Sequence, residues 1–555
     1  MDDLSPESQA LSNPVILQEI FQYKSLSGKD LRLVSKLWNE VTLSLPRPKL
    51  CLKLNHSLKQ ACCDPSKFLD TIYPTLSTPK LARFIRISAG CTYHVQQDPE
   101  GIPHSRGASD VSAEKLISTV CQKYSETIQE IKIHSRLVVL PTLYEILSKY
   151  CPKLKRLSVT CPRRRGGMMD STFDSPLPKK SNLEYIRFIL DDPPHTFMQQ
   201  VLNAAPNLRT LFIVGNLYPD LDKNTNLYRL FHYGRGKNGA RGSTQAFNGG
   251  SLTRLISQVA NSLVYLKIGL NTDQGKYCPD TNRDEFTLPE SMPKLKQLHN
   301  RCVDIFKCPD GTGGLIWAGK KFQNLDQIIF GCSVAAAGKD VLDTFLKLFS
   351  SKVVLSRTVR KIVVQDLTES LGPLANLKIV YPFVTEVELF FLHMGGTLQE
   401  EVNPAVFSSQ LEVLLKSGGL TKITFNMTLE LKLSDFVKAL SDNKELFKGM
   451  WNKYLDLGRT SGCRSDCGTI GIAEWGRESP AKDIADDLYE SGKMEKYGIK
   501  DFIREFESVL FAMKELELVV ISGVVLRGPT AQLIINFIRD EKLPVQFLLG
   551  GGNTD

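Results

Sequence analysis

Residues 151–161 read CPKLKRLSVTC, and this short stretch contains the motif that organises most of the chain. Leu154, Leu157 and Val159 follow one another at steps of three and two residues. Successive side chains of a β-strand point to opposite faces, so Leu157 and Val159 share one face while Arg156 and Ser158 share the other. The motif therefore predicts a strand that enters a core on one side only.

The same apolar spacing returns roughly every 25–35 residues, an interval typical of solenoid proteins. Its copies begin at Ile128, Leu154, Leu183, Leu208, Leu263, Leu325, Val359, Val384 and Leu420. A further copy begins at Leu295 but has Asn300 at its third apolar position, and less regular members lie at 50–54 and 516–518. A repeated strand of this kind buries its apolar face by stacking on its neighbours.

Segments with helical periodicity separate the strands, and we expect them at 113–125, 141–150, 196–205, 252–261, 339–350 and 405–416. An order of strand, turn, helix and return is what a parallel sheet requires. Ordinary α/β alternation with several independent sheets is the alternative. The regularity of the motif favours a solenoid with a curved parallel sheet.

The N-terminal stretch 12–48 predicts two or three short amphipathic helices. Pro14 opens the first of them, as proline does at a first helical position. About 40 residues bury too little surface to be stable alone, so their apolar faces need a partner. That partner is either the repeat domain of the same chain, which the helices would cap, or a separate protein.

This stretch resembles the F-box, above all in Leu33-Val34-Ser35-Lys36-Leu37-Trp38. With the repeats that follow it, the chain resembles the F-box/leucine-rich-repeat proteins. The resemblance implies an N-terminal motif that docks on the Skp-type adaptor of a Skp–cullin–F-box ubiquitin ligase. The side chains that it assigns to the adaptor contact are Pro14, Leu17, Ile20, Phe21, Leu26, Leu31, Val34 and Trp38.

The expected architecture is thus α/β, with an F-box-like motif at 1–48 and a divergent leucine-rich-repeat solenoid at 49–555. Three gaps in the motif predict loop insertions near 162–180, 217–250 and 430–512. The first two include basic runs and the third is rich in Gly, Arg and Cys. Each insertion could contact a substrate or a phosphate, or could be an ordinary solvated loop.

A protein partner would meet the outward-facing residues of the strands. The early strands combine Arg or Lys with Tyr or Phe, residue types that are enriched in binding hot spots. Glu386 and Glu388 reverse the charge in later strands, which suits a protein better than a uniform polyanion. Our candidate substrate-binding residues are Arg156, Tyr185, Arg187, Phe212, Tyr265 and Lys267.

The composition argues against several other classes of protein. The net charge of +9 over 555 residues is too low for a dedicated nucleic-acid binder. The chain starts Met-Asp-Asp without a signal-like apolar run, and its apolar stretches are too short for a membrane span. With 13 scattered cysteines, we expect reduced thiols and a cytoplasmic or nuclear location.

Motifs for chemistry are incomplete. The string from Gly314 to Lys321 resembles a P-loop, but Lys321 replaces the hydroxyl residue that holds magnesium. Cys463 and Cys467 lack a second ligand pair for zinc. We therefore expect no catalytic residue, metal or cofactor. The sequence leaves three hypotheses: a ligase substrate receptor, a leucine-rich-repeat scaffold without ligase function, and a nucleotide-dependent or hydrolytic enzyme.

Overall fold

The structure is a computed structural model of the whole chain. The residues that it describes are 11, 13–22, 37–38, 41, 52–56, 83–89, 108–134, 140–161, 173, 175–190, 195–235, 247–271, 286–301, 322–331, 354, 356–365, 374, 376–391, 404–417, 419–427, 433–447, 454–458, 499–514, 516, 518–522 and 528–548. They divide into two compact units, which we describe separately. Unit 1 extends to Tyr233, and unit 2 comprises most of the chain from Ala246 onward.

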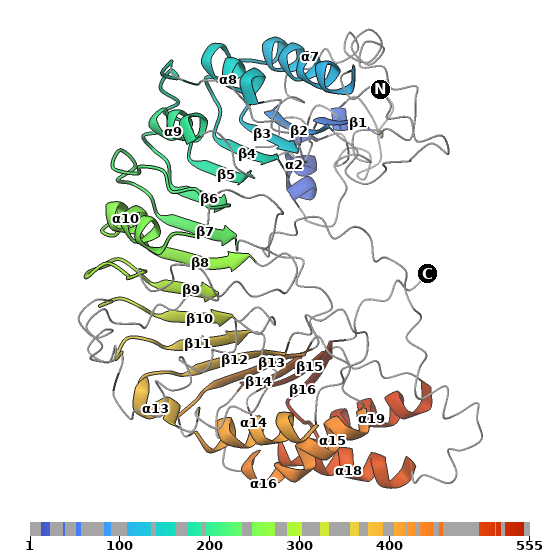
Figure 1. Ribbon diagram of the computed structural model, residues 1–555. Helices are drawn as coiled ribbons and strands as arrows, with labels where there is room; N and C mark the ends of the chain where they lie inside the picture. Colours follow the sequence, from blue (N-terminus) through green and yellow to red (C-terminus); the bar gives the residue numbers. More distant parts are fainter. Residues whose placement is uncertain are drawn as a thin grey trace, which may run out of the picture. The chain divides into compact units, whose positions relative to one another are not determined.

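Unit 1 contains a parallel sheet whose strands follow one another in sequence order (Figure 1). Each strand is hydrogen-bonded in parallel to the next one in the chain. These strands are β1 (Leu52–His56), β2 (Phe84–Ala89), β3 (Glu130–His134), β4 (Arg156–Cys161), β5 (Tyr185–Leu190), β6 (Thr210–Val214) and β7 (Arg229–Arg235). Such an order requires each connection to return the chain to the same end of the sheet.

Helices provide several of these returns in unit 1. They are α7 (Ala108–Lys123), α8 (Leu140–Lys149) and α9 (His195–Asn203), and α2 (Pro14–Gln22) precedes the sheet. Figure 1 shows α7, α8 and α9 on one side of the strands. Leu140, Leu143, Ile146 and Leu147 form the buried stripe of α8, as the helical period requires.

Unit 2 repeats this arrangement. Its parallel strands, again in sequence order, are β8 (Tyr265–Asn271), β9 (Gln297–Arg301), β10 (Gln327–Gly331), β11 (Lys361–Gln365), β12 (Glu386–Phe391), β13 (Lys422–Met427), β14 (Tyr454–Gly458), β15 (Leu518–Ser522) and β16 (Val545–Leu548). Its helices are α10 (Gly249–Val259), α13 (Leu377–Val380), α14 (Pro404–Lys416), α15 (Leu433–Asp442), α16 (Lys444–Phe447), α18 (Ile499–Ala512) and α19 (Gly528–Asp540). The α/β class and the parallel order of the strands confirm that part of the prediction.

The repeated apolar positions form the core of each unit. In β4 to β6, the first and second leucines of the motif and the residue two positions further on are all fully buried. The strand begins two residues after the first leucine, so Leu154 lies in the turn before β4 and Leu157 within it. Each such side chain contributes roughly 1.5–3 kcal/mol when it leaves water. Repetition of the motif therefore stabilises one continuous core per unit.

Backbone hydrogen bonds join consecutive repeats where the strands begin. The carbonyl of Lys155 accepts hydrogen bonds from both Glu184 N (2.9 Å) and Tyr185 N (3.1 Å). In the next repeat, the carbonyl of Glu184 accepts in the same way from Arg209 N (2.9 Å) and Thr210 N (3.0 Å). One carbonyl therefore satisfies two donors of the next repeat, and it fixes the register of each pair of strands.

Asparagine side chains add a second connection between repeats. Asn182, Asn207 and Asn324 each stand directly before the first leucine of a repeat. Their amides donate to the carbonyls of Pro152 (3.5 Å), Ser181 (2.9 Å) and Pro293 (2.6 Å), respectively. Each acceptor lies two residues before the first leucine of the preceding repeat. An asparagine at this position thus makes an equivalent hydrogen bond in three repeats.

Strands also occur where the motif was not recognised. β7 lies within 217–250, where the sequence predicts a loop insertion, and β14, α15, α16 and α18 lie within 430–512. β2 and β16 were not among the expected strands either. The expected helix at 339–350 lies outside the described residues, whereas the other five expected helices are present as α7, α8, α9, α10 and α14.

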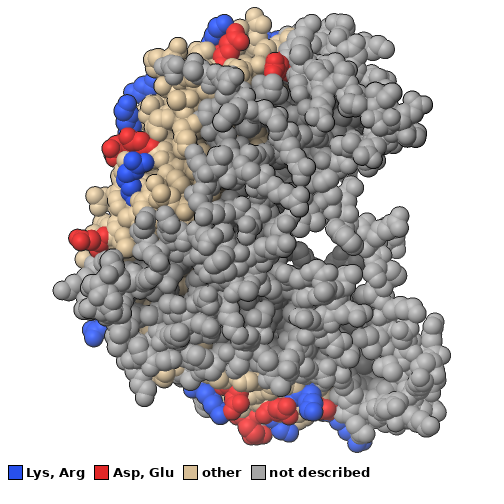
Figure 2. Space-filling model, viewed as in Figure 1, with Lys and Arg blue, Asp and Glu red and all other residues tan. Residues whose placement is uncertain are grey.

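The helical surface of each unit carries charges of both signs. Figure 2 shows Lys and Arg interspersed with Asp and Glu among the described residues on the face in view. Lys149 pairs with Glu145 (2.7 Å) one turn away on α8, and Lys416 pairs with Glu412 on α14. Such pairs at i and i+4 contribute little to stability and are typical of a solvated helix face.

Candidate protein-interaction sites

The N-terminal helical motif has a small core of its own. Leu17 and Val41 are buried together, with Ile20, Leu37 and Trp38 partly buried against them. The indole nitrogen of Trp38 donates a hydrogen bond to the carbonyl of Leu11 (3.1 Å). Asn13 Oδ1 accepts from Val15 N (2.9 Å), which caps the start of α2 just before Pro14. Leu17, Ile20 and Trp38 therefore hold the described parts of this motif together.

Several apolar side chains at the start of the N-terminal motif are exposed. Leu11, Val15 and Ile16 are 47%, 69% and 40% exposed. Pro14 is exposed as well. Exposed apolar side chains that follow one another on a surface are a common feature of protein-binding sites. The remaining candidate contacts, Leu26, Leu31 and Val34, lie outside the described residues, and of Phe21 only the backbone is described.

A ladder of charged and aromatic side chains crosses the outward-facing positions of the unit 1 sheet. Arg156 on β4 stacks on Tyr185 of β5, with 4.5 Å between the guanidinium carbon and the ring centroid. Its Nε also pairs with Glu130 of β3 (3.3 Å), which in turn pairs with Lys132 (3.1 Å). Parallel register places Glu130, Arg156 and Tyr185 side by side on adjacent strands. Arg156 is therefore neutralised and held in place by its neighbours.

In the next row of the same face, the described residues include a cation but no anion beside it. Arg187 on β5 lies beside Phe212 of β6 and stacks on its ring at 4.8 Å. Phe212 in turn contacts Phe231 (5.5 Å between ring centroids) and Tyr233 (5.7 Å), both on β7. Arg187 Nε is buried without a hydrogen-bond partner in the part of the chain that the structure describes. Four of our candidate residues, Arg156, Tyr185, Arg187 and Phe212, therefore lie on one surface.

The sequence analysis missed several members of this surface. Phe231 and Tyr233 belong to β7, whose third core position is occupied by His232 in place of an apolar residue. Glu130 and Lys132 belong to the strand of the first recognised repeat, whose outward residues lacked an aromatic signal. If the register of these strands had been known, the alternation of side chains between the two faces of the sheet would have identified all four residues.

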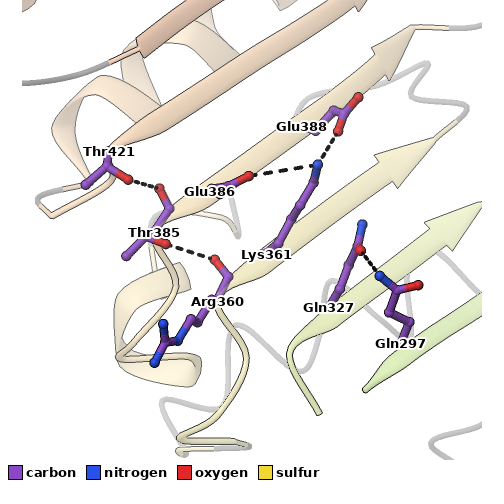
Figure 3. Close-up of polar contacts among 8 residues, drawn as sticks. All are labelled: Gln297, Gln327, Arg360, Lys361, Thr385, Glu386, Glu388 and Thr421. Carbon is purple, nitrogen blue, oxygen red and sulfur yellow. Dashed lines mark hydrogen bonds and ion pairs between the residues drawn. The ribbon is translucent and has the colours of Figure 1, made fainter. Parts of the chain in front are cut away.

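The other two candidates, Tyr265 and Lys267, lie in unit 2 on β8. The corresponding face of unit 2 carries polar ladders, shown in Figure 3. Gln297 donates an amide hydrogen bond to Gln327 (2.9 Å) on the next strand. Lys361 Nζ pairs with Glu388 (2.9 Å) and lies 3.9 Å from Glu386. Lys361 thus lies between the two glutamates that reverse the charge and offsets one of their two negative charges.

The described residues offer no metal site, since no group of three or more His, Cys, Asp or Glu side chains lies close enough together to bind an ion. Cys121, Cys151 and Cys161 are buried thiols, and a hydrogen bond to Cys151, together with burial, raises the pKa of Cys121. The P-loop-like string, Cys463 and Cys467 lie outside the described residues. Among the helices that the structure describes, none is long and apolar enough to cross a membrane.

Comparison with known proteins adds no assignment. No family model matches the chain, and no curated protein matches it. The two surfaces described above are therefore the basis for assigning a function.

Proposed function

We propose that this protein is the substrate-recognition subunit of a Skp–cullin–F-box ubiquitin ligase. In this proposal the N-terminal motif binds a Skp-type adaptor, and through it cullin, while a divergent leucine-rich-repeat solenoid holds a protein substrate. The observation that carries the proposal is a group of exposed apolar side chains, Leu11 just before α2 and Val15 and Ile16 in its first turn, within the motif that resembles the F-box. The parallel sheet in sequence order agrees with the solenoid.

Such a subunit performs no chemistry itself. By holding a substrate lysine near the loaded conjugating enzyme, it raises the effective concentration of the two reactants. The proposal therefore requires no cofactor, metal or catalytic residue in this chain, and it places the protein in the cytoplasm or the nucleus, where these ligases act.

The N-terminal motif contains both packed and exposed apolar residues, and this difference suggests how to test the proposal. Leu17, Ile20 and Trp38 contact one another, so we assign to them the internal stability of the motif as well as its shape. Val15 and Ile16 can be changed without opening that cluster. Each exposed aliphatic side chain that becomes buried at an interface contributes up to roughly 1.5–3 kcal/mol.

Co-purification with a Skp-type adaptor tests the proposal directly. We expect the unmodified chain to retain the adaptor and the double variant Val15→Asp, Ile16→Asp to lose it while its circular dichroism spectrum stays unchanged. Glu19→Gln, an exposed change on the same helix, should retain the adaptor. If the unmodified chain never retains an adaptor, the alternative holds: a leucine-rich-repeat scaffold whose N-terminal helices cap the repeats.

A further inference from the structure

Arg187 is a partly buried cation of the unit 1 ladder, and no described residue offsets its charge. Arg156 and Lys132 share the carboxylate of Glu130. Arg187 makes the ring contact with Phe212, but in the described part of the chain its guanidinium has neither a hydrogen-bond acceptor nor an anion. Its Nε–H donor is buried, and leaving a buried donor unpaired is costly.

The side chain of Arg187 is also fixed in position. It is partly buried, and its planar group lies against Phe212, which Phe231 and Tyr233 support from the next strand. A planar donor group that is held before the ligand arrives loses little entropy on binding. Two parallel N–H donors of a guanidinium match the two oxygens of a carboxylate.

The charge of the surroundings selects the same ligand. On β3 to β6 the outward positions carry Lys132, Arg156 and Arg187 against the single carboxylate of Glu130. These positions therefore carry three cations against one anion, and Arg187 is the cation among them without a carboxylate partner in the described part of the chain. One unpaired guanidinium suits a single carboxylate, whereas a phosphate dianion commonly recruits more than one cation.

We propose that the Arg187 surface binds an acidic segment of a protein substrate, with one Asp or Glu carboxylate of that segment accepting two hydrogen bonds from Arg187. This inference rests on the proposed function, because it names the kind of substrate that the receptor takes. It adds that recognition requires a carboxylate, and that Phe212 acts as a positioning residue for Arg187.

A peptide array provides the test. The probe is a set of immobilised nonapeptides with randomised flanks and a central Glu, Gln, Lys or phosphoserine, incubated with the full-length chain. Selected peptides are then measured by fluorescence polarisation. We expect the Glu peptides to bind at least about tenfold more tightly than the Gln peptides, since hydrogen bonds to a charged group contribute that much.

The variants separate this surface from general electrostatics. Arg187→Gln should reduce Glu-peptide binding to the Gln level, and Arg187→Lys should not restore it because an ammonium lacks the planar fork. Phe212→Leu should weaken binding while leaving all charges in place. Arg209→Gln removes the same charge from an exposed position outside the sheet face and should have no effect.

Three outcomes would overturn the inference: equal binding of Glu and Gln peptides, binding of phosphoserine peptides alone, or Glu-peptide binding that survives Arg187→Gln. Adaptor retention, measured in the same preparations, keeps the two proposals distinct. A chain that retains the adaptor but binds no acidic peptide contradicts only the inference. A chain that binds the peptide through Arg187 without retaining an adaptor contradicts only the ligase assignment.

Discussion

His232 is a polar residue at a core position that the neighbouring repeat fills with Ile213. It is fully buried, its Nε2 lies 3.0 Å from the carbonyl of Leu217, and its ring stacks on Tyr218. Burial lowers its pKa from 6.5 to about 4. The ring is therefore neutral at physiological pH, with the proton assigned to Nε2, where it can donate to Leu217.

This shift makes the stability of unit 1 depend on pH. Above pH 6.5 the ring is neutral in the folded and the unfolded chain, and its contribution is fully present. Between pH 6.5 and 4 the unfolded chain binds a proton that the folded chain does not, so acidification favours unfolding. We expect wild type to lose on the order of 2 kcal/mol more than His232→Leu between pH 7 and pH 4.5.

Urea denaturation at the two pH values measures the difference. His195→Gln, a change at an exposed histidine on α9, should behave as wild type does. Equal losses in wild type and His232→Leu would show that the imidazole is not kept neutral by the fold.

Gly215 at the end of β6 is a position that only glycine fits. Its φ is +133°, and a Cβ there would lie 2.7 Å from the carbonyl oxygen of Leu190. Its N–H donates to Tyr233 O (2.9 Å), so the backbone cannot move away without losing a bond between strands. We expect Gly215→Ala to lower the free energy of unfolding by about 2–3 kcal/mol.

Gly419 provides the matched comparison in a urea titration. Its φ is +77°, but a Cβ there would meet only the end of the Lys378 side chain, at 3.2 Å. That side chain can move, so Gly419→Ala should cost only about 1 kcal/mol. Similar losses for both variants would mean that the contact with Leu190 is relieved.

At the scale of the element, the asparagines before the first leucines connect the turns of adjacent repeats. Asn207→Ala removes the bond to Ser181 O and should cost about 0.5–1 kcal/mol, the usual net value of an exposed neutral hydrogen bond. Lys153 occupies the equivalent position in another repeat, and Lys153→Ala should leave the unfolding midpoint nearly unchanged. A loss at Lys153 as large as at Asn207 would contradict the role of the amide.

Most strands could be predicted because their motif is local. Two apolar residues at alternate positions, with a third apolar residue three positions before them, identify a strand without knowledge of the rest of the fold. β7 was hidden because His232 interrupts that pattern, and β16 because Lys542 stands where a leucine is expected three residues before Val545. In both strands the folded protein tolerates a polar residue at a position where the sequence motif requires an apolar one.

Of the candidate surface, the residue types were predictable but their partners were not. The pairing of Arg156 with Glu130 depends on the register of two strands that are connected through α8. Likewise, only the neighbours of Arg187 in space show that no described anion lies beside it. At the N-terminus, the predicted adaptor contacts include Leu17, which is buried within the motif, and omit Val15, which is exposed.

At the scale of the whole molecule, each strand contacts mainly the strands before and after it in the chain. In such an array stability arises from each repeat and its nearest neighbours. Perturbation of one repeat should therefore remain local, in contrast to a protein in which distant segments share one central core.

Hydrogen exchange followed by mass spectrometry tests this locality. Leu211→Ala should cost about 2–5 kcal/mol and accelerate exchange in β5, β6 and β7 while leaving α18 and α19 unchanged. Ile362→Ala in β11 should do the same for β10 to β12. Uniform acceleration across the chain in either variant would indicate a single cooperative unit.

The asparagine bonds also have a practical use. Lys153 and Lys294 occupy the position at which Asn182, Asn207 and Asn324 reach back to the preceding turn. These positions therefore suggest a way to stabilise the protein. Substituting asparagine in the remaining turns would add further hydrogen bonds of the kind that Asn182, Asn207 and Asn324 make. Because these hydrogen bonds lie before the strands begin, such substitutions would not change the outward-facing strand residues that are proposed to contact a partner.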